Sequence, residues 1–169
     1  QDGQYVALFR KLRRDDAEMN ERMGGTNMVA FLVEGKGQDS LKDPKVLQAM
    51  SALQTYLAGQ PHVGKTQSIA DIVKRMNQAM HADDPAYYVL PDNQELIAQY
   101  LFLYTLSGDP QDFDNLVDND YQKAVIWVYL KDDRSVYNAA LCQKALGFIA
   151  QNFPPTVTVS LGSTVPQNI

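Results

Sequence analysis

Residues 59–66 read Gly-Gln-Pro-His-Val-Gly-Lys-Thr and match the pattern G-x-x-x-x-G-K-[ST], in which backbone N–H groups and a lysine bind nucleotide phosphates. Such a loop must follow a buried strand and lead directly into a helix whose N-terminus faces the phosphates. Here a helix is predicted before the segment, Pro61 removes one backbone donor, and the next helix is predicted to begin at Ser68. The context therefore favours a helix end followed by a short strand, with Lys65 and Thr66 facing solvent.

The other residues with catalytic or metal-binding chemistry are scattered along the chain. His62 and His81 fall on different predicted elements, and neither has a second ligand at metal-binding spacing. Cys142 lies on the apolar face of a predicted helix, where it is interpreted as a small buried hydrophobic residue. Turn and capping roles are expected for the acidic pairs Asp83-Asp84, Asp118/Asp120 and Asp132-Asp133. We therefore assign no catalytic, cofactor-binding or metal-binding residue, although a Ser–His–Asp or Cys–His site stays open.

The composition is that of one globular domain. The chain has 169 residues, of which 45% are hydrophobic and 9% aromatic. With 15 basic and 20 acidic residues the formal charge is -5, which argues against nucleic acid as a partner. A single cysteine excludes an internal disulfide. No apolar run approaches the roughly 18 residues that a membrane-spanning helix needs, so the chain as given is expected to be soluble.

Hydrophobic spacing predicts the elements that must position any site. Residues 5–12 place Tyr5, Leu8, Phe9 and Leu12 on one face of an amphipathic helix. The basic residues that follow are interpreted as solvated side chains in preference to a lipid-binding cluster. Strands are predicted at 26–35, 62–67, 124–130 and 156–161. The strand at 124–130 is the strongest of the four, because it is apolar throughout.

Helices are predicted between these strands, and several have capping residues at their ends. Asp43 precedes Pro44 at the start of the first, with Gly59 as its C-terminal glycine. Ser68 with Asp71 forms a capping box for the second helix. The predicted cap of the third is Asp92 with Glu95, and Asp133 or Ser135 opens the fourth.

The order of elements is β-α-β, then two inserted helices, then β-α-β. This order predicts an α+β protein of the ferredoxin-like, split βαβ type, with a four-stranded sheet and helices on one face. The predicted division of the chain is a helical arm at 1–25, the ferredoxin-like domain at 26–162 with a helical insertion at about 69–108, and a linker at 163–169.

A run of segments in this chain resembles a known family. The segments are TNMVAFLVEG, DPKVLQAMSALQTYL, PHVGKTQSIADIVKRMNQAM, LPDNQELIAQYLFLYTLSG and DYQKAVIWVYLKD. In order they are similar to the large extracytoplasmic loop of exporters of the resistance–nodulation–division (RND) superfamily, MMPL-type branch, over roughly residues 20–162. The resemblance is carried by the succession of Gly-Gly, Asp-Pro, Pro-x-Val, Ser-Ile, Leu-Pro and Asp-Tyr before the elements, and none of these is a catalytic signature.

The resemblance implies a periplasmic, porter-type domain of a proton-driven inner-membrane exporter. Its partners would be the transmembrane helices and the second porter domain of the same protein, together with hydrophobic or lipid-like cargo. The missing methionine and the polar end STVPQNI fit a segment of a longer protein, with 163–169 leading toward a membrane segment. The proton-relay residues would lie outside this chain. No cofactor, nucleic acid or enzymatic activity is implied.

One stretch is apolar almost all round its predicted helix and is the candidate cargo-facing or domain-docking surface. The candidate residues are Tyr87, Tyr88, Tyr100, Phe102, Leu103 and Tyr104. The alternative is that this helix is sandwiched in the core of its own domain. An exposed patch predicts a homo-oligomer of the isolated domain. Two other functions stay open, namely a free-standing ferredoxin-like ligand-binding or sensor module and, more distantly, a small nucleotide- or phosphate-handling enzyme.

Overall fold

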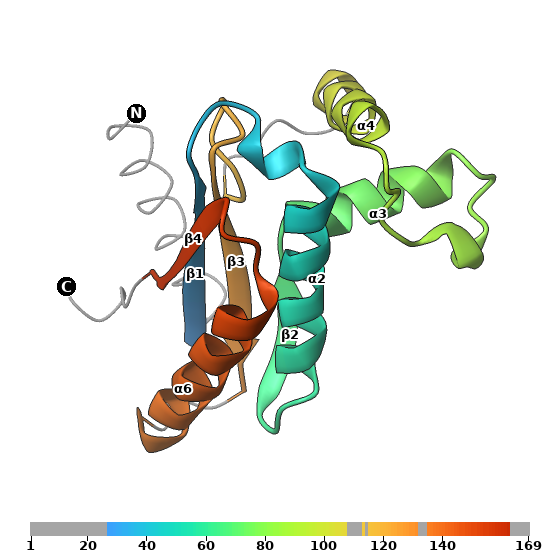
Figure 1. Cartoon of the computed structure of the whole chain (residues 1–169). Coiled ribbons are helices and arrows are strands. Elements are labelled where there is room, and N and C mark those ends of the chain that lie inside the picture. Colours follow the sequence, from blue (N-terminus) through green and yellow to red (C-terminus); the bar gives the residue numbers. More distant parts are fainter. Residues whose placement is uncertain (1–26, 108–112, 114, 132–134, 163–169) are drawn as a thin grey trace.

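The computed structural model describes residues 27–107, 113, 115–131 and 135–162 (Figure 1). The predicted arm at 1–25, with its helix at 5–12, and the predicted linker at 163–169 lie outside the described residues, as does Asp133. The described elements form a four-stranded sheet and the helices around it.

The sheet consists of β1 (Asn27–Gly35), β2 (Val63–Gln67), β3 (Lys123–Leu130) and β4 (Val157–Leu161) in the order β2-β3-β1-β4. All three neighbouring pairs are antiparallel. The helices between β1 and β2, and between β3 and β4, therefore connect strands that are parallel and separated by one strand. The predicted α+β, split βαβ fold is confirmed.

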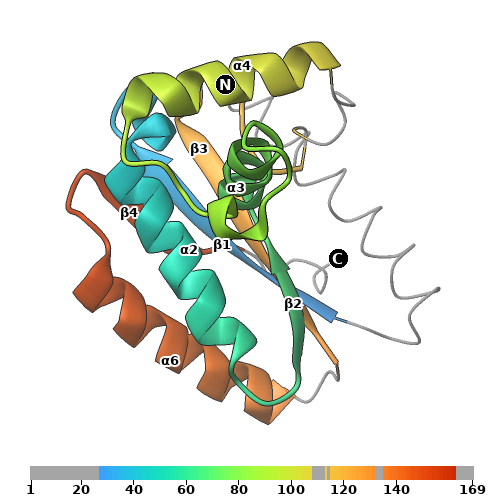
Figure 2. The same ribbon diagram turned by 90° about the vertical axis from the view of Figure 1, so that its right-hand side faces the viewer.

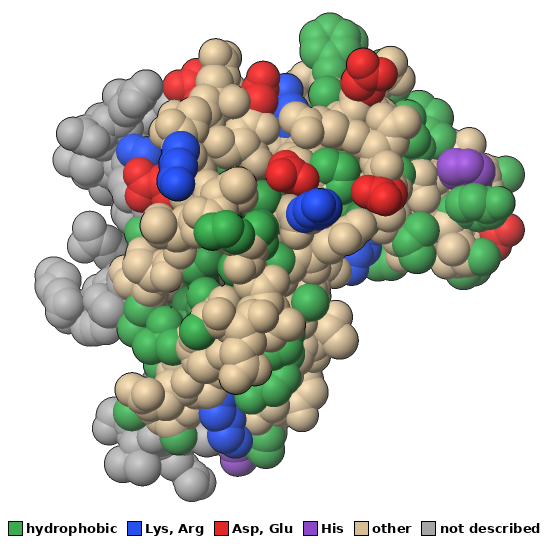
Figure 3. Space-filling model, in the orientation of Figure 1, with side chains coloured by type: hydrophobic (Ala, Val, Ile, Leu, Met, Phe, Trp, Pro, Cys, Tyr) green, Lys and Arg blue, Asp and Glu red, His purple; other side chains and the backbone are tan. Residues whose placement is uncertain are grey.

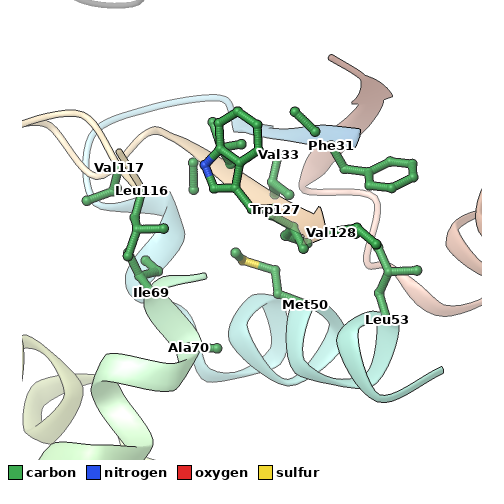
Figure 4. Close-up of a cluster of buried hydrophobic side chains, with 14 of the residues drawn as sticks. Phe31, Val33, Met50, Leu53, Ile69, Ala70, Leu116, Val117, Trp127 and Val128 are labelled. Atoms are coloured by element: carbon green, nitrogen blue, oxygen red, sulfur yellow. The ribbon is translucent and has the colours of Figure 1, made fainter. Parts of the chain in front are cut away.

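Helices α2 (Pro44–Ala58) and α6 (Ser135–Asn152) cover one face of this sheet (Figure 2). Because side chains alternate along a strand, Phe31 of β1 and its partner Ile126 of β3 share that face. Both are buried, as are Met50 and Leu53 of α2. In Figure 4 the Trp127 indole lies on the side of β3 opposite to these two α2 side chains. The main core thus lies between the sheet and the helix pair.

The predicted starts of two helices are confirmed. Asp43 accepts a hydrogen bond from the Lys45 backbone N–H at 2.9 Å, and Pro44 is the first residue of α2. Helix α3 (Ile69–Ala79) begins with a complete capping box, in which Ser68 accepts from the Ala70 N–H and Asp71 accepts from the Ser68 N–H. These contacts satisfy backbone donors that have no partner inside a helix.

One detail of the predicted helix ends is wrong. Asn93, and not Asp92, caps α4 (Gln94–Ser107), since its Oδ1 accepts from the Leu96 N–H at 3.1 Å. A cap must stand immediately before the first helical residue, and Asp92 is one position too early. The prediction that Gly59 is the C-terminal glycine of α2 is confirmed, and its φ of -82° is one that any residue adopts. The left-handed turn that redirects the chain is at His62, with φ 68°.

Two helices and two short 3-10 helices complete the described fold. Helix α3, η2 (Pro85–Tyr87) and α4 stand between β2 and β3 in the chain, where a plain ferredoxin-like fold has a short connection. Both helices extend beyond the sheet and α2 (Figures 1 and 2), and α4 packs on α3 and on η1 (Ser40–Lys42). We call the segment from α3 to α4 the helical insertion.

Candidate docking surface

The inner side of α4 is part of the protein core. Ile97, Tyr100 and Leu101 are buried there, and the exposed fraction of Tyr100 is 4%. The Tyr100 hydroxyl donates a hydrogen bond of 2.8 Å to Oδ1 of Asn77 on α3. Burial raises the pKa of Tyr100 above its ordinary value, because the charged phenolate would lose its water. This side of α4 therefore holds the helix against α3 and is not available to a partner.

Asn77 is the polar centre of the helical insertion. Its side chain is buried, and its Nδ2 donates to the Tyr87 carbonyl oxygen at 2.8 Å. One turn later, Nδ1 of His81 lies 2.7 Å from the Asn77 carbonyl oxygen, and an N–H at this nitrogen would donate to it. The His81 ring also stacks on Tyr87, with 3.9 Å between ring centroids. One buried amide thus ties α3 to both α4 and η2.

The outer side of α4 exposes large apolar side chains. The exposed fractions of Phe102 and Leu106 are 62% and 68%, and Leu103 beside them is also exposed. Because residues four apart lie one above the other on a helix, Phe102 and Leu106 form one continuous patch with Leu103 at its side. We call these three residues the α4 face.

A second group of exposed apolar side chains lies at the end of the insertion. It consists of Met80, Tyr87, Tyr88 and Val89, and we call it the η2 tip. Hydrophobic side chains gather at this projecting end of the molecule in Figure 3. The ammonium of Lys74 lies 5.7 Å from the centroid of the Tyr88 ring. The pKa of Tyr88 is raised, first by burial and then by the charge of Asp71, against an opposing effect of Arg75.

Some of the residues predicted to form the docking surface are exposed in the structure, and others are buried. Tyr87, Tyr88, Phe102 and Leu103 are exposed, whereas Tyr100 is buried. Tyr104 is half-buried and packs edge-on against Phe113, with 5.2 Å between ring centroids. The predicted list also lacked three exposed residues, Met80, Val89 and Leu106. Leu106 could have been predicted from the sequence, because it follows Phe102 at helical spacing. Met80 and Val89 lie just after α3 and η2, where helical spacing gives no such signal.

The segment at 59–66 does not form a phosphate-binding loop. It follows the end of α2, and Lys65 and Thr66 lie within β2. The Lys65 ammonium is 5.0 Å from the centroid of the Tyr129 ring on the same face of the sheet. The N-terminus of the next helix is already capped by the Ser68 hydroxyl, with the Asp71 carboxylate beside it. A carboxylate at this position would repel a phosphate.

The other residues that were considered as candidates lie on separate elements or contact the protein's own backbone and core. His62 precedes β2 and His81 follows α3, so the two histidines lie on different elements. Burial raises the pKa of the half-buried Cys142 thiol. Asp118 is buried and accepts hydrogen bonds from the backbone N–H groups of Gln122 and Lys123, at 2.9 and 3.1 Å. Within the described ranges, no group of three or more His, Cys, Asp and Glu residues could hold a metal ion.

Two further observations bear on the class of protein. No helix in the described part of the chain has both the length and the apolar character needed to cross a membrane. Comparison of the sequence with protein-family models and with curated protein sequences finds no match. Function is therefore inferred from the fold and from the exposed apolar side chains.

Proposed function

We propose that this chain is an extracytoplasmic, porter-type domain of a proton-driven RND-type membrane exporter, and that it contributes to the docking or passage of hydrophobic, lipid-like cargo. The observation that carries the proposal is the α4 face. Three large apolar side chains stand exposed on a helix whose other side is buried. Exposed apolar patches of this kind mark protein–protein, lipid or ligand contacts.

The position of the α4 face supports a docking role. It lies on the helical insertion, which extends beyond the sheet and α2 (Figure 2). A partner can therefore contact α4 without disturbing the sheet or the core beneath it. In the proposed exporter the partners are the second porter domain and the transmembrane helices of the same protein, and the domain faces the periplasm.

The fold and the sequence resemblance support the class of protein. The segments that resemble the RND-type loop supply strands β1, β2 and β3 of a split βαβ sheet and the helical insertion between β2 and β3. Fold alone does not determine function, because ferredoxin-like sheets occur in proteins of unrelated activity. The exposed apolar side chains of the α4 face are the local feature that supports a docking or transport role.

The first test is the reading frame that encodes this chain. Apolar spans of about 20 residues on both sides of the encoded domain are expected for an exporter loop. A protease added to intact spheroplasts should then cleave the domain in the complete protein, because the domain would face the periplasm. Soluble flanking sequence would contradict the exporter and would support a free-standing binding or sensor module.

The second test addresses the α4 face in the complete protein. Replacing Phe102 and Leu106 by Asp should abolish export of the lipid-like cargo while leaving the amount of protein in the membrane unchanged. The matched control replaces Gln94 by Asp at the start of the same helix, where the side chain is already polar and exposed and lies more than two turns before Phe102. Full export by the double variant would contradict a role of this surface in transport.

A further inference from the structure

The two outer strands of the sheet differ in how well their edges are protected against pairing with another strand. Proteins commonly protect an exposed edge with a charged side chain, a proline or a bulge. Strand β2 carries Lys65, and its register against β3 shifts between Val63 and Lys65, as at a β-bulge. Strand β4 has the sequence VTVSL, without charge, proline or glycine, and it pairs with β1 in an unbroken register. The edge of β4 therefore lacks these protections.

One hydrogen bond identifies the backbone groups of β4 that point away from β1. The Gly162 N–H donates to the Ala30 carbonyl oxygen at 2.6 Å. Because inward-pointing and outward-pointing residues alternate along an antiparallel strand, Thr158 and Ser160 also form hydrogen bonds with β1. The residues whose N–H and C=O groups point outward are then Val157, Val159 and Leu161.

Most of these outward backbone groups have no hydrogen-bond partner. The Val157 N–H donates to the Pro154 carbonyl oxygen at 3.4 Å. Among the residues that the structure describes, no group bonds to the N–H of Val159 or Leu161, or to the carbonyl oxygens of the three outward residues. Strand β4 ends the described sheet on this side (Figure 2). The exposed fraction of the Leu161 side chain is 41%, so the edge beside it is accessible to a partner.

The pattern of unpaired groups defines the chemistry of that partner. Two donors and three acceptors alternate along β4 at the spacing of an extended chain. The backbone of another extended peptide complements this pattern, because it offers acceptors and donors in the same alternation. We propose that β4 binds an extended segment of another protein, which adds to the sheet as a further strand antiparallel to β4.

The side chains of β4 indicate the sequence that such a segment needs. Leu161 stands opposite Phe31 of β1, so the side chains of Leu161 and Val159 lie on the face that α2 and α6 cover. Thr158 and Ser160 are on the other face, and both are exposed. Directly opposed side chains of neighbouring strands contact each other. The segment should therefore alternate apolar residues, beside Leu161 and Val159, with uncharged polar residues.

A second copy of this chain fits the edge less well than a separate segment. Two β4 strands related by a two-fold axis at Val159 would place Val157 of one copy opposite Leu161 of the other. Since the Val157 N–H already bonds to Pro154, each Leu161 carbonyl oxygen would then lack a donor. A separate segment can donate to all three outward carbonyl oxygens. The inference rests on the sheet alone and holds whether or not the chain belongs to an exporter.

Amide hydrogen exchange of the whole chain, followed residue by residue by NMR, tests the proposal. In the free chain the Val159 and Leu161 amides should exchange faster than those of Thr158 and Ser160, which are the internal control. A synthetic peptide of alternating valine and threonine, with lysine at both ends, should slow exchange at Val159 and Leu161 several-fold at millimolar concentration. The same peptide with every backbone amide methylated should have no effect, because it cannot donate hydrogen bonds.

Three results would overturn the proposal. Slow exchange at Val159 and Leu161 in the free chain would show that the edge is already paired. Equal exchange with and without the peptide, or equal slowing by both peptides, would show that no strand is added. Protection that increases with protein concentration would assign the edge to a second copy instead.

A substitution at the edge provides an independent measurement. Val159→Pro removes one outward donor and leaves the hydrogen bonds between β4 and β1 in place. The peptide should then no longer slow exchange at Leu161. Ser160→Ala is the control, because it keeps every outward backbone group, and it should respond to the peptide like the unsubstituted chain. If Val159→Pro does not fold, the comparison of the two peptides on the unsubstituted chain still decides the question.

Discussion

Gln54 is a buried amide at the junction of α2, β2 and α3. Its Oε1 accepts from the Ser68 hydroxyl at 2.7 Å, and its Nε2 donates to Asp71 Oδ2 at 2.9 Å and to Thr66 Oγ1 at 3.2 Å. Asp71 is at the same time the capping-box carboxylate of α3. The amide therefore fixes the point at which the helical insertion leaves the sheet.

We predict that Gln54→Met lowers the free energy of unfolding by about 3 kcal/mol, because it keeps the side-chain volume but leaves buried polar partners without hydrogen bonds. The control is Gln60→Met just beyond the same helix, where the amide is less buried, with an expected loss below about 0.5 kcal/mol. Urea unfolding measures both. Equal losses in the two variants would contradict the structural role of Gln54.

Tyr121 predicts how the protein responds to alkaline pH. Its pKa is raised above 10.0, first by burial and then by the negative charge of Asp39. The unfolded chain therefore ionises this phenol at a lower pH than the folded protein does. The free energy of unfolding therefore keeps its full value below pH 10.0, where Tyr121 is neutral in both states. It falls as the pH rises toward the pKa of Tyr121 in the folded protein.

We therefore predict that Tyr121→Phe has a smaller loss of stability at alkaline pH than the unsubstituted protein. Part of the loss should persist in the variant, because burial also raises the pKa values of Tyr100 and Cys142. The measurement is urea unfolding at about pH 7 and about pH 10.5, so that the difference between the two values isolates the ionisation. An unchanged alkaline loss in the variant would contradict the effect of Tyr121.

Two leucines of helix α4 are expected to differ in how much they contribute to the free energy of unfolding. Leu101 is 1% exposed, whereas Leu106 lies on the α4 face. We predict that Leu101→Ala lowers the free energy of unfolding by about 2–5 kcal/mol, since it leaves a cavity in the core. Leu106→Ala should change it by less than about 0.5 kcal/mol, because the side chain is already in water. Thermal unfolding of the two variants tests the orientation of the helix, and similar losses would contradict it.

The ends of the elements were largely predictable because capping is local chemistry. Asp43, Pro44, Ser68 and Asp71 act within a few residues of their own positions, so the sequence contains all that is needed to predict them. The face of α4 was not predictable in the same way. That helix is apolar on both sides, so its pattern does not distinguish the buried Tyr100 from the exposed Phe102.

At the scale of the whole molecule, the order of elements was sufficient to predict the sheet. Two β-α-β units in succession constrain the strands to the order β2-β3-β1-β4, and the apolar run of β3 indicates a central strand. The path of the helical insertion is not constrained in this way. It depends on long-range contacts such as the hydrogen bond from Tyr100 to Asn77, and neither residue indicates its partner in the sequence.

The α4 face also predicts the behaviour of the isolated chain in solution. Without a partner, two copies can bury their Phe102, Leu103 and Leu106 side chains against each other about a two-fold axis. Three side chains make a patch smaller than the roughly 800 Å² per partner of a stable interface, so we predict weak self-association that increases with concentration. Sedimentation velocity over a concentration series should detect it.

Phe102→Asp combined with Leu106→Asp should make the chain monomeric at every concentration, because pairing would bury four unpaired carboxylates in each dimer. Met80→Asp on the η2 tip is the matched control and should associate like the unsubstituted chain. The opposite result, with Met80→Asp monomeric and the double variant still associating, would place the contact on the η2 tip. A partner that covers α4 should suppress self-association in proportion to its occupancy, since both would use the same side chains.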